Sequence, residues 1–203
     1  MGSMAFTAQY LQRPAPEEGN LIKWKWFEYY DELPAWRSGD RVIQSWDTAL
    51  TANELSDYSV CTTWLVRDNN YYLLDVYRKR LEYPDLVHAI VRHKRKFNAK
   101  PILIEDAASG KSLIPHLRRE ATDLRVTKVK PEKDKVTRMK MASIEIESGK
   151  VFLPEKAPWM GPFQKELMAF PGSSYDDQVD SVSQFLNWVT KPRGMVVKPL
   201  GGL

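Results

Sequence analysis

Alternating apolar and polar residues predict three β-strands in the first half of the chain. The segments are RVIQSWD (41–47), YSVCTTWLV (58–66) and YYLLDVYR (71–78), all rich in β-branched and aromatic residues. Asn69 and Asn70 separate the last two segments and predict a tight hairpin turn, because asparagine tolerates the left-handed backbone conformation that such turns need. We therefore expect three consecutive strands, paired in antiparallel fashion.

The rest of the chain changes to a helical period interrupted by short apolar runs. Apolar residues recur at helical spacing in YPDLVHAIVRHKRKFN (83–98), and a strand, PILI (101–104), follows. Further expected elements are a helix at 109–119, a strand at 124–130, and helices at 133–148, 162–169 and 175–189. Three leading antiparallel strands followed by alternating helices and parallel strands indicate an α/β fold, a central mixed sheet flanked by helices.

Residues 5–40 lack a long regular period. They contain several prolines and the tryptophan-rich stretch KWKWFEYYDELPAW (23–36). We expect an ordered arm whose aromatic residues dock on the domain. The opening Met-Gly-Ser-Met resembles an expression scar in front of a segment that belongs to a longer protein.

Composition fits one intracellular domain. The chain has 203 residues, 43% of them hydrophobic, and its net charge of +4 is only a weak sign of a polyanionic partner. Cys61 is the single cysteine, so no internal disulfide can form, and its apolar neighbours indicate a core position. His88, His93 and His116 show no familiar ligand spacing and are interpreted as helix-surface residues. No apolar stretch reaches the ~18 residues that cross a bilayer, so we expect a soluble protein without a membrane partner.

The segment ILIEDAASGKS (102–112) contains Gly-Lys-Ser and raises the possibility of a nucleotide-binding P-loop. That motif also needs a glycine five positions before Gly110, and this position is Glu105. A carboxylate there would repel a triphosphate, so the P-loop is excluded and this chain is not expected to hydrolyse ATP. The strand instead delivers Glu105 and Asp106 to its end, on opposite sides, so one of them must face away.

Carboxylates at strand ends are the strongest candidates for chemistry. Asp47 ends the first predicted strand and Glu105 the fourth, each after an apolar run where an uncompensated charge is costly to bury. Asp176, Asp177 and Asp180 open the last helix, where they could also be ordinary helix caps. Oxygen ligands without a histidine or cysteine cluster suit Mg²⁺ or Mn²⁺ better than zinc.

Five segments form a recognisable combination. They are AQYLQRPAPEEGNLIKWKWF (8–27), SWDTALTANELSDYSV (45–60), ILIEDAASGKSLIPHL (102–117), DKVTRMKMASIEIESGKVFLP (134–154) and SYDDQVDSVSQFL (174–186). In this order they resemble the nuclease domain of the large terminase subunit, the DNA-packaging motor of tailed bacteriophages. The resemblance implies a ribonuclease-H-like fold, which we assign to residues 40–190, and a C-terminal tail at 191–203.

The resemblance also implies roles for individual acids. Asp47 matches the first-strand metal ligand, Glu105 the fourth-strand acid and Asp177 the helix aspartate, and these three are the expected catalytic residues. Asp176 is a possible second contributor from the helix. Asp57 matches a recurrent acid of the family that could contact metal or cap a turn.

The implied function is a metal-dependent, largely sequence-independent DNA endonuclease that cuts concatemeric viral DNA during genome packaging. Two Mg²⁺ or Mn²⁺ ions would serve phosphodiester hydrolysis. The implied partners are double-stranded DNA, an N-terminal ATPase domain to which residues 1–39 would be the linker, the portal and the small terminase subunit, in the cytoplasm of the bacterial host. Two alternatives remain open: another ribonuclease-H-like nuclease, of the junction resolvase or transposase type, and a non-catalytic DNA- or portal-binding module.

Basic residues gather in RVTKVKPEKDKVTRMK (125–140). Such a run is either a solvated face or a patch that follows DNA phosphates beside the carboxylates. The residues expected to contact DNA are Lys111, Lys128, Lys130, Lys133, Lys135 and Arg138.

Overall fold

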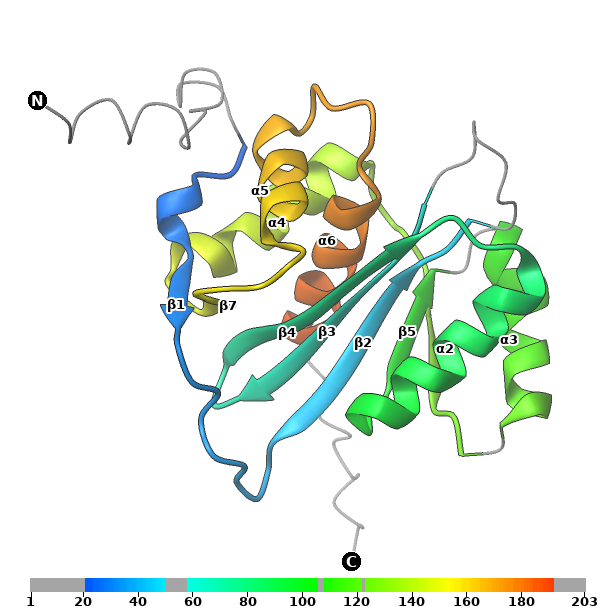
Figure 1. Ribbon diagram of the computed structural model, residues 1–203. Helices are drawn as coiled ribbons and strands as arrows, with labels where there is room; N and C mark the ends of the chain where they lie inside the picture. The colour runs from blue at the N-terminus through cyan, green and yellow to red at the C-terminus, as the bar shows by residue number, and fades with distance from the viewer. Residues whose placement is uncertain (1–20, 50–57, 106–107, 122, 192–203) are drawn as a thin grey trace, which may run out of the picture.

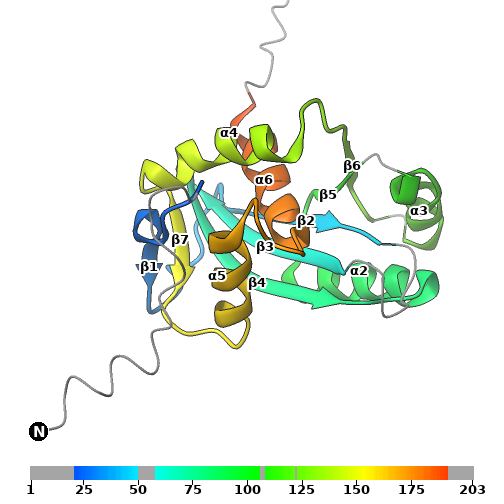
Figure 2. The same ribbon diagram turned by 90° about the horizontal axis from the view of Figure 1, so that it is seen from above.

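The computed structural model describes residues 21–49, 58–105, 108–121 and 123–191. In this part of the chain, seven strands form one mixed sheet in the order β1-β7-β4-β3-β2-β5-β6, with helices on both faces (Figures 1 and 2). The strands are β1 (Glu28–Tyr30), β2 (Arg41–Asp47), β3 (Ser59–Arg67), β4 (Asn70–Lys79), β5 (Ile102–Glu105), β6 (Val126–Val129) and β7 (Val151–Pro154). The helices are the short 3₁₀ helix η1 (Trp24–Trp26), α2 (Tyr83–Phe97), α3 (Ala108–Glu120), α4 (Lys135–Glu147), α5 (Met160–Ala169) and α6 (Asp177–Thr190).

The strand pairing confirms the predicted mixed sheet. β2, β3 and β4 pair in antiparallel fashion, and β5 and β6 then continue the sheet beyond β2 as parallel strands. A right-handed crossover through α2 is the usual way for a chain to place β5 parallel to a strand of the same sheet. The carboxyl ends of β2 and β5 consequently lie side by side at one edge of the molecule (Figure 1).

The turn between β3 and β4 lies one residue earlier than predicted. Arg67 pairs with Asn70, so the two turn residues are Asp68 and Asn69, with φ of 47° and 61°. Two consecutive left-handed residues form the turn that matches the twist of a hairpin. Aspartate tolerates this conformation nearly as well as asparagine, which explains why the Asn-Asn pair misled the prediction.

Two layers of helices cover the two faces of the sheet (Figure 2). Helices α4, α5 and α6 pack on the face that includes Ile43 and Leu103, where Trp64 stacks on Phe185 with ring centroids 4.6 Å apart. Helices α2 and α3 pack on the opposite face, around Trp46 and Ile104. Because side chains alternate along a strand, odd-numbered residues of β2 and β5 point toward α6.

The segment before β2 belongs to the same sheet and core. Strand β1 pairs in parallel with β7, and Ile22 and Phe27 are buried in the core. Trp24 lies against Phe163 of α5 with a centroid separation of 6.4 Å, which is the predicted docking of an aromatic residue, whereas Trp36 is exposed. Residues 21–39 therefore do more than a linker would, since they add a strand to the sheet edge.

Two sequence interpretations of single residues have different outcomes. Cys61 is buried in the core, as predicted. His93 is also buried, contrary to the helix-surface interpretation, and its ring lies against Tyr77 and Trp46 with centroids 4.3 and 6.0 Å away. In the described residues, no helix combines the length and apolarity that crossing a membrane requires.

Candidate active site

Strands β2 and β5 bring the two strand-end acids together. Trp46 of β2 lies opposite Ile104 of β5 in the parallel register, so Asp47 and Glu105 follow as neighbours at the strand ends. Both share the face of Ser45 and Leu103, which α6 covers. The prediction that these two acids converge is therefore consistent with the structure, and Glu105 is the acid that faces this side. Asp106 lies outside the described residues.

A buried network of hydroxyl groups fixes α6 on the sheet. The Ser181 hydroxyl donates to the Ser45 carbonyl oxygen and the Ser45 hydroxyl donates to the Ser181 carbonyl oxygen, each at 2.8 Å. Thr62 of β3 donates its backbone N–H to Ser181 Oγ at 3.2 Å, and the two hydroxyl oxygens lie 2.8 Å apart. Gln184 Nε2 donates to Ser45 Oγ at 2.8 Å. These contacts set the position of the first turn of α6 relative to the end of β2.

A cleft of about 160 Å³ opens where these elements meet. Its walls come from the ends of β2 and β5, the first turn of α4, the first turn of α6 and Tyr58 before β3. The lining residues are Asp47, Thr48, Ala49, Tyr58, Glu105, Lys135, Arg138, Asp176, Asp177 and Asp180. Five of these ten residues are carboxylates, so the cleft concentrates negative charge.

The electrostatics of the cleft resist ionisation of Asp47. Burial, followed by the charges of Asp180, Asp177 and Glu105, raises the pKa of Asp47 well above its ordinary value, and Lys135 opposes this shift. Burial also raises the pKa of Asp180, against hydrogen bonds and charges from Lys135 and Arg138 that lower it. Like charges held together in this way are typical of sites that recruit a cation.

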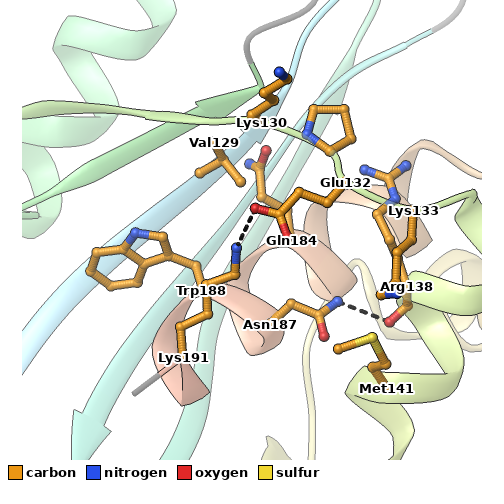
Figure 3. Close-up of a pocket in the computed structure, with 11 residues that line it drawn as sticks. Val129, Lys130, Glu132, Lys133, Arg138, Met141, Gln184, Asn187, Trp188 and Lys191 are labelled. Carbon is orange, nitrogen blue, oxygen red and sulfur yellow. Dashed lines mark hydrogen bonds and ion pairs between the residues drawn. The ribbon is translucent and has the colours of Figure 1, made fainter. Parts of the chain in front are cut away.

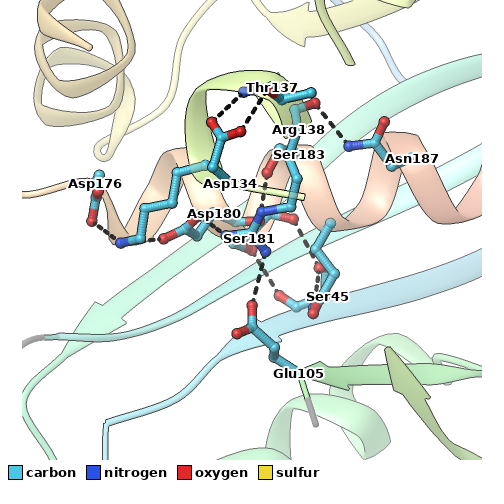
Figure 4. Close-up of polar contacts among 12 residues, drawn as sticks. Ser45, Glu105, Asp134, Thr137, Arg138, Asp176, Asp180, Ser181, Ser183 and Asn187 are labelled. Atoms are coloured by element: carbon cyan, nitrogen blue, oxygen red, sulfur yellow. Dashed lines mark hydrogen bonds and ion pairs between the residues drawn. The ribbon is translucent and has the colours of Figure 1, made fainter. Parts of the chain in front are cut away.

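Two basic residues of α4 reach into the carboxylates (Figure 4). The Lys135 ammonium lies 2.7 Å from both Asp176 Oδ1 and Asp180 Oδ2. The Arg138 guanidinium bridges Glu105 Oε2 at 3.0 Å and Asp180 Oδ1 at 2.7 Å. Lys135 and Arg138 were expected to contact DNA phosphates, and in this structure their charged groups are engaged by the acids of the cleft.

Asp180 is the acid that sequence reasoning undervalued. The expected acids Asp47, Glu105, Asp176 and Asp177 all line the cleft, and Asp180 joins them as the residue that binds Lys135 and Arg138 of α4. Its spacing of three from Asp177 places both on one helix face, a signal present in the sequence. The capping alternative does not hold for Asp176, whose side chain accepts no capping hydrogen bond. Asp57 lies outside the described residues.

A second group of residues, outside the cleft, contacts Asp177 and the start of α6. Arg78 of β4 approaches Asp177 Oδ2 at 3.9 Å and Glu166 Oε2 of α5 at 3.3 Å. The buried Glu166 carboxylate accepts hydrogen bonds from the backbone N–H and the side-chain Nε2 of Gln178, at 2.7 and 2.6 Å, and so caps α6 from a neighbouring helix. The Arg78 guanidinium also lies 3.7 Å from the centre of the Tyr58 ring. Sequence patterns gave no indication of this group.

The remaining basic residues lie beyond Arg138. Lys130 and Lys133 are exposed and line a small pocket of about 70 Å³ together with Trp188, and Arg138 forms part of its wall (Figure 3). Lys128 is exposed on β6. Helix α3 begins just after Glu105, but the Lys111 side chain lies outside the described residues. The DNA contacts of these four lysines remain predictions.

The carboxylates of the cleft are a suitable ligand set for a hard divalent cation, but they are paired with two cations of the protein. Carboxylate oxygens from two strands and a helix are the ligands that Mg²⁺ and Mn²⁺ prefer. Yet within the described ranges no three His, Cys, Asp or Glu side chains are arranged so that together they could hold a metal ion as they stand. Lys135 and Arg138 are bound among the carboxylates instead.

Solved structures with the same fold come from phage large terminases. The large terminase nuclease of thermophilic phage G20c, solved with bound magnesium, matches with a TM-score of 0.65 and 14% identity over 85% of this chain and 98% of that chain. The nuclease domain of Thermus phage P74-26 large terminase matches with a TM-score of 0.56 and 13% identity over 79% and 90%. A longer large terminase, from another thermophilic bacteriophage, matches with a TM-score of 0.59 and 13% identity over 82% of this chain and 44% of that chain, so this chain spans less than half of that protein.

No match was found among curated proteins. A comparison of the sequence with protein families gives a match that is independent of the structure and more specific. Residues 44–188 match the family described as the terminase RNaseH-like domain, and this range contains the described carboxylates of the cleft. Because the match covers most of the chain, the protein belongs to the terminase RNaseH-like domain family.

Proposed function

We propose that this domain is a divalent-metal-dependent endodeoxyribonuclease that cuts concatemeric viral DNA during genome packaging, largely without regard to sequence. The observation that carries the proposal is the cleft at the ends of β2 and β5, where five carboxylates gather in a chain of the terminase RNaseH-like family. The G20c nuclease, which has the same fold, has been solved with magnesium and with cobalt.

The residues proposed to hold metal are Asp47, Glu105, Asp177 and Asp180, with Asp176 at the rim and Asp57 as a further contributor. Two Mg²⁺ or Mn²⁺ ions, when bound, would supply an activated water and stabilise the leaving oxygen of a phosphodiester. The chain itself orients the acids: the hydroxyl network holds α6 against β2, and Arg78 steadies Asp177. Lys130 and Lys133 lie on the surface beyond Arg138, where they could contact the DNA backbone.

The wider context follows from the family and is proposed with it. The longer phage large terminase, of which this chain covers less than half, has been solved in complex with ADP. We propose that this domain likewise works beside an ATPase domain, joined through residues 1–39, with residues 191–203 as a tail. The portal, the small terminase subunit and the bacterial cytoplasm are the partners and the location proposed for the packaging machine.

A plasmid-nicking assay tests the nuclease. The unmodified domain should convert supercoiled plasmid to open-circular and linear DNA with Mn²⁺ and leave it intact with EDTA. Asp47→Asn should abolish cleavage, because a neutral amide is a poor ligand for a divalent ion. The matched control is Asp123→Asn, since Asp123 is an exposed acid paired with Lys94 away from the cleft, and this variant should cut at the unmodified rate.

Two further measurements separate the alternatives. With a four-way junction as a second substrate, cleavage confined to the junction would favour a junction resolvase. In a gel-shift assay, binding of DNA without Mn²⁺-dependent cleavage would favour a non-catalytic binding module. Normal cleavage by Asp47→Asn would show that the carboxylate cleft is not the active site.

A further inference from the structure

The two cations in the cleft occupy the oxygens that a metal ion would need. Arg138 binds Asp180 Oδ1 and Lys135 binds Asp180 Oδ2, so both oxygens of this carboxylate are engaged. Arg138 also binds Glu105 Oε2, and Lys135 also binds Asp176 Oδ1. A metal ion entering the cleft must therefore compete with protein cations for three carboxylates.

Helix α4 is anchored so that both cations point into the cleft. Asp134 caps the helix by accepting a hydrogen bond from the Thr137 backbone N–H at 2.9 Å. Asn187 of α6 donates to the Arg138 carbonyl oxygen at 2.9 Å and ties the two helices together (Figure 4). Lys135 and Arg138, three residues apart, then share the helix face that meets Asp180.

We propose that Lys135 and Arg138 are internal counter-ions of the metal site, which hold its carboxylates together without metal and give way when a divalent ion binds. This inference rests on the proposed function, because it assumes that the cleft binds metal. Such counter-ions explain why the acids can lie close together, since the two salt-bridged cations neutralise part of the repulsion between the carboxylates. Lys135 and Arg138 are positioning residues in this scheme.

The charges leave the cleft attractive to metal. Five carboxylates less two cations leave a formal excess of three negative charges when all are ionised. The two cations differ in how easily they can leave. The side chain of Lys135 is 50% exposed, whereas that of Arg138 is 13% exposed. Lys135 can therefore move into water at a lower cost than Arg138, and displacement of the more buried Arg138 is expected to be the larger barrier to metal binding.

Displaced cations would gain a second role. If Asp180 served as a metal ligand, the ammonium of Lys135 would be free to bind another anion beside the cleft, and a DNA phosphate would be a suitable partner. The ion pairs of Lys135 and Arg138 within the cleft are thus compatible with the predicted phosphate contacts of the same residues. Metal would be required both for chemistry and for exposing part of the DNA-binding charge.

Calorimetric titration with Mn²⁺ tests the proposal without relying on cleavage. Arg138→Gln should bind Mn²⁺ about tenfold more tightly than the unmodified domain, since a competing charge is removed, and Lys135→Gln should show a smaller gain. Arg138→Lys should restore part of the competition. The control Lys191→Gln removes a cation that pairs with Glu132 outside the cleft, and its affinity should be unchanged.

Melting in EDTA provides the second readout. Both glutamine variants should melt below the unmodified domain, because the carboxylates lose their counter-ions, and saturating Mn²⁺ should narrow this difference. Unchanged or weaker Mn²⁺ binding in Lys135→Gln and Arg138→Gln would overturn the inference while leaving the nuclease proposal intact. If Arg138→Gln does not fold, Lys135→Gln decides. Failure of the unmodified domain to bind Mn²⁺ would overturn both proposals.

Discussion

Ser181→Ala is expected to loosen the attachment of α6 to the sheet. Ser181 is fully buried, and its hydroxyl contacts the Ser45 carbonyl oxygen and both the N–H and the hydroxyl of Thr62. Truncation removes these contacts and leaves a small cavity in the place of the hydroxyl group. The Thr62 hydroxyl keeps the hydrogen bond that it accepts from Trp64 Nε1, and Ser45 and Thr62 remain paired with each other across β2 and β3. The loss is therefore limited to the hydrogen bonds that the Ser181 hydroxyl makes to these two strands.

The size of the effect follows from the hydrogen bonds that the Ser181 hydroxyl makes. A typical intramolecular hydrogen bond contributes about 0.5–1.5 kcal/mol to stability. For the two bonds that join α6 to Ser45 and Thr62, we expect a loss of about 1–3 kcal/mol in the free energy of unfolding. For a domain of this size, about 2–4 °C of melting temperature corresponds to each kcal/mol, so the melting temperature should fall by roughly 2–12 °C.

Urea denaturation and thermal melting in EDTA measure this loss, with Ser183→Ala as the matched control. Ser183 is also fully buried in α6, but its hydroxyl bonds only to the Asp180 carbonyl oxygen of its own helix, at 3.2 Å. Its replacement should cost less than about 1 kcal/mol, because such local bonds add little to a helix. Ser181→Ala should also weaken Mn²⁺ binding, since Asp180 precedes it directly. Equal losses in the two variants would refute the idea that this network positions α6.

Three further predictions concern charge. Burial and neighbouring acids raise the pKa of Asp47, so its ionised form destabilises the folded domain when EDTA removes metal. At about pH 8 in EDTA, Asp47→Asn should therefore melt at or above the melting temperature of the unmodified domain. This difference in melting temperature should shrink as the pH falls through the raised pKa. A variant that melts well below the unmodified domain would identify Asp47 as a structural residue. Burial lowers the pKa of His93, so the stability that depends on its neutral form should be lost as the pH falls below about 6.5. In His93→Gln, the melting temperature should fall less between about pH 7 and 5. An unchanged dependence of melting temperature on pH would show that His93 is not the group responsible. Neutralising Lys130 and Lys133 should weaken DNA binding for all sequences alike and reduce the slope of log K against log salt by about 2, whereas an unchanged slope would make them a solvated surface.

The convergence of Asp47 and Glu105 could be predicted from the sequence because the positions of both acids depend on strong local patterns. Each acid follows an apolar strand, and the order of strands and helices makes those strands parallel neighbours. Two hydrophobic faces then determine which way each side chain points. Helix and strand bounds lie close to those predicted for the same reason.

The role of Asp180 and the α4 cations could not be obtained in this way. Their contacts depend on how α4 lies against α6, which a single hydrogen bond from Asn187 to the Arg138 carbonyl oxygen helps to define. A basic run in a sequence looks the same whether it faces water or a cluster of acids. Strand β1 escaped prediction because three residues show no period, and its pairing with β7 joins segments far apart in the chain.

The edges of the sheet have a consequence for how the domain meets other chains. One edge is β1, which has only three residues and is followed by Asp31, Glu32 and, soon after, Pro34. The other is β6, four residues long, which carries exposed Lys128 and ends shortly before Pro131. Short, charged edges followed by proline discourage the addition of a foreign strand and the aggregation that follows from it. Neighbouring copies or partners are therefore expected to meet this domain through side-chain surfaces and not by extending its sheet.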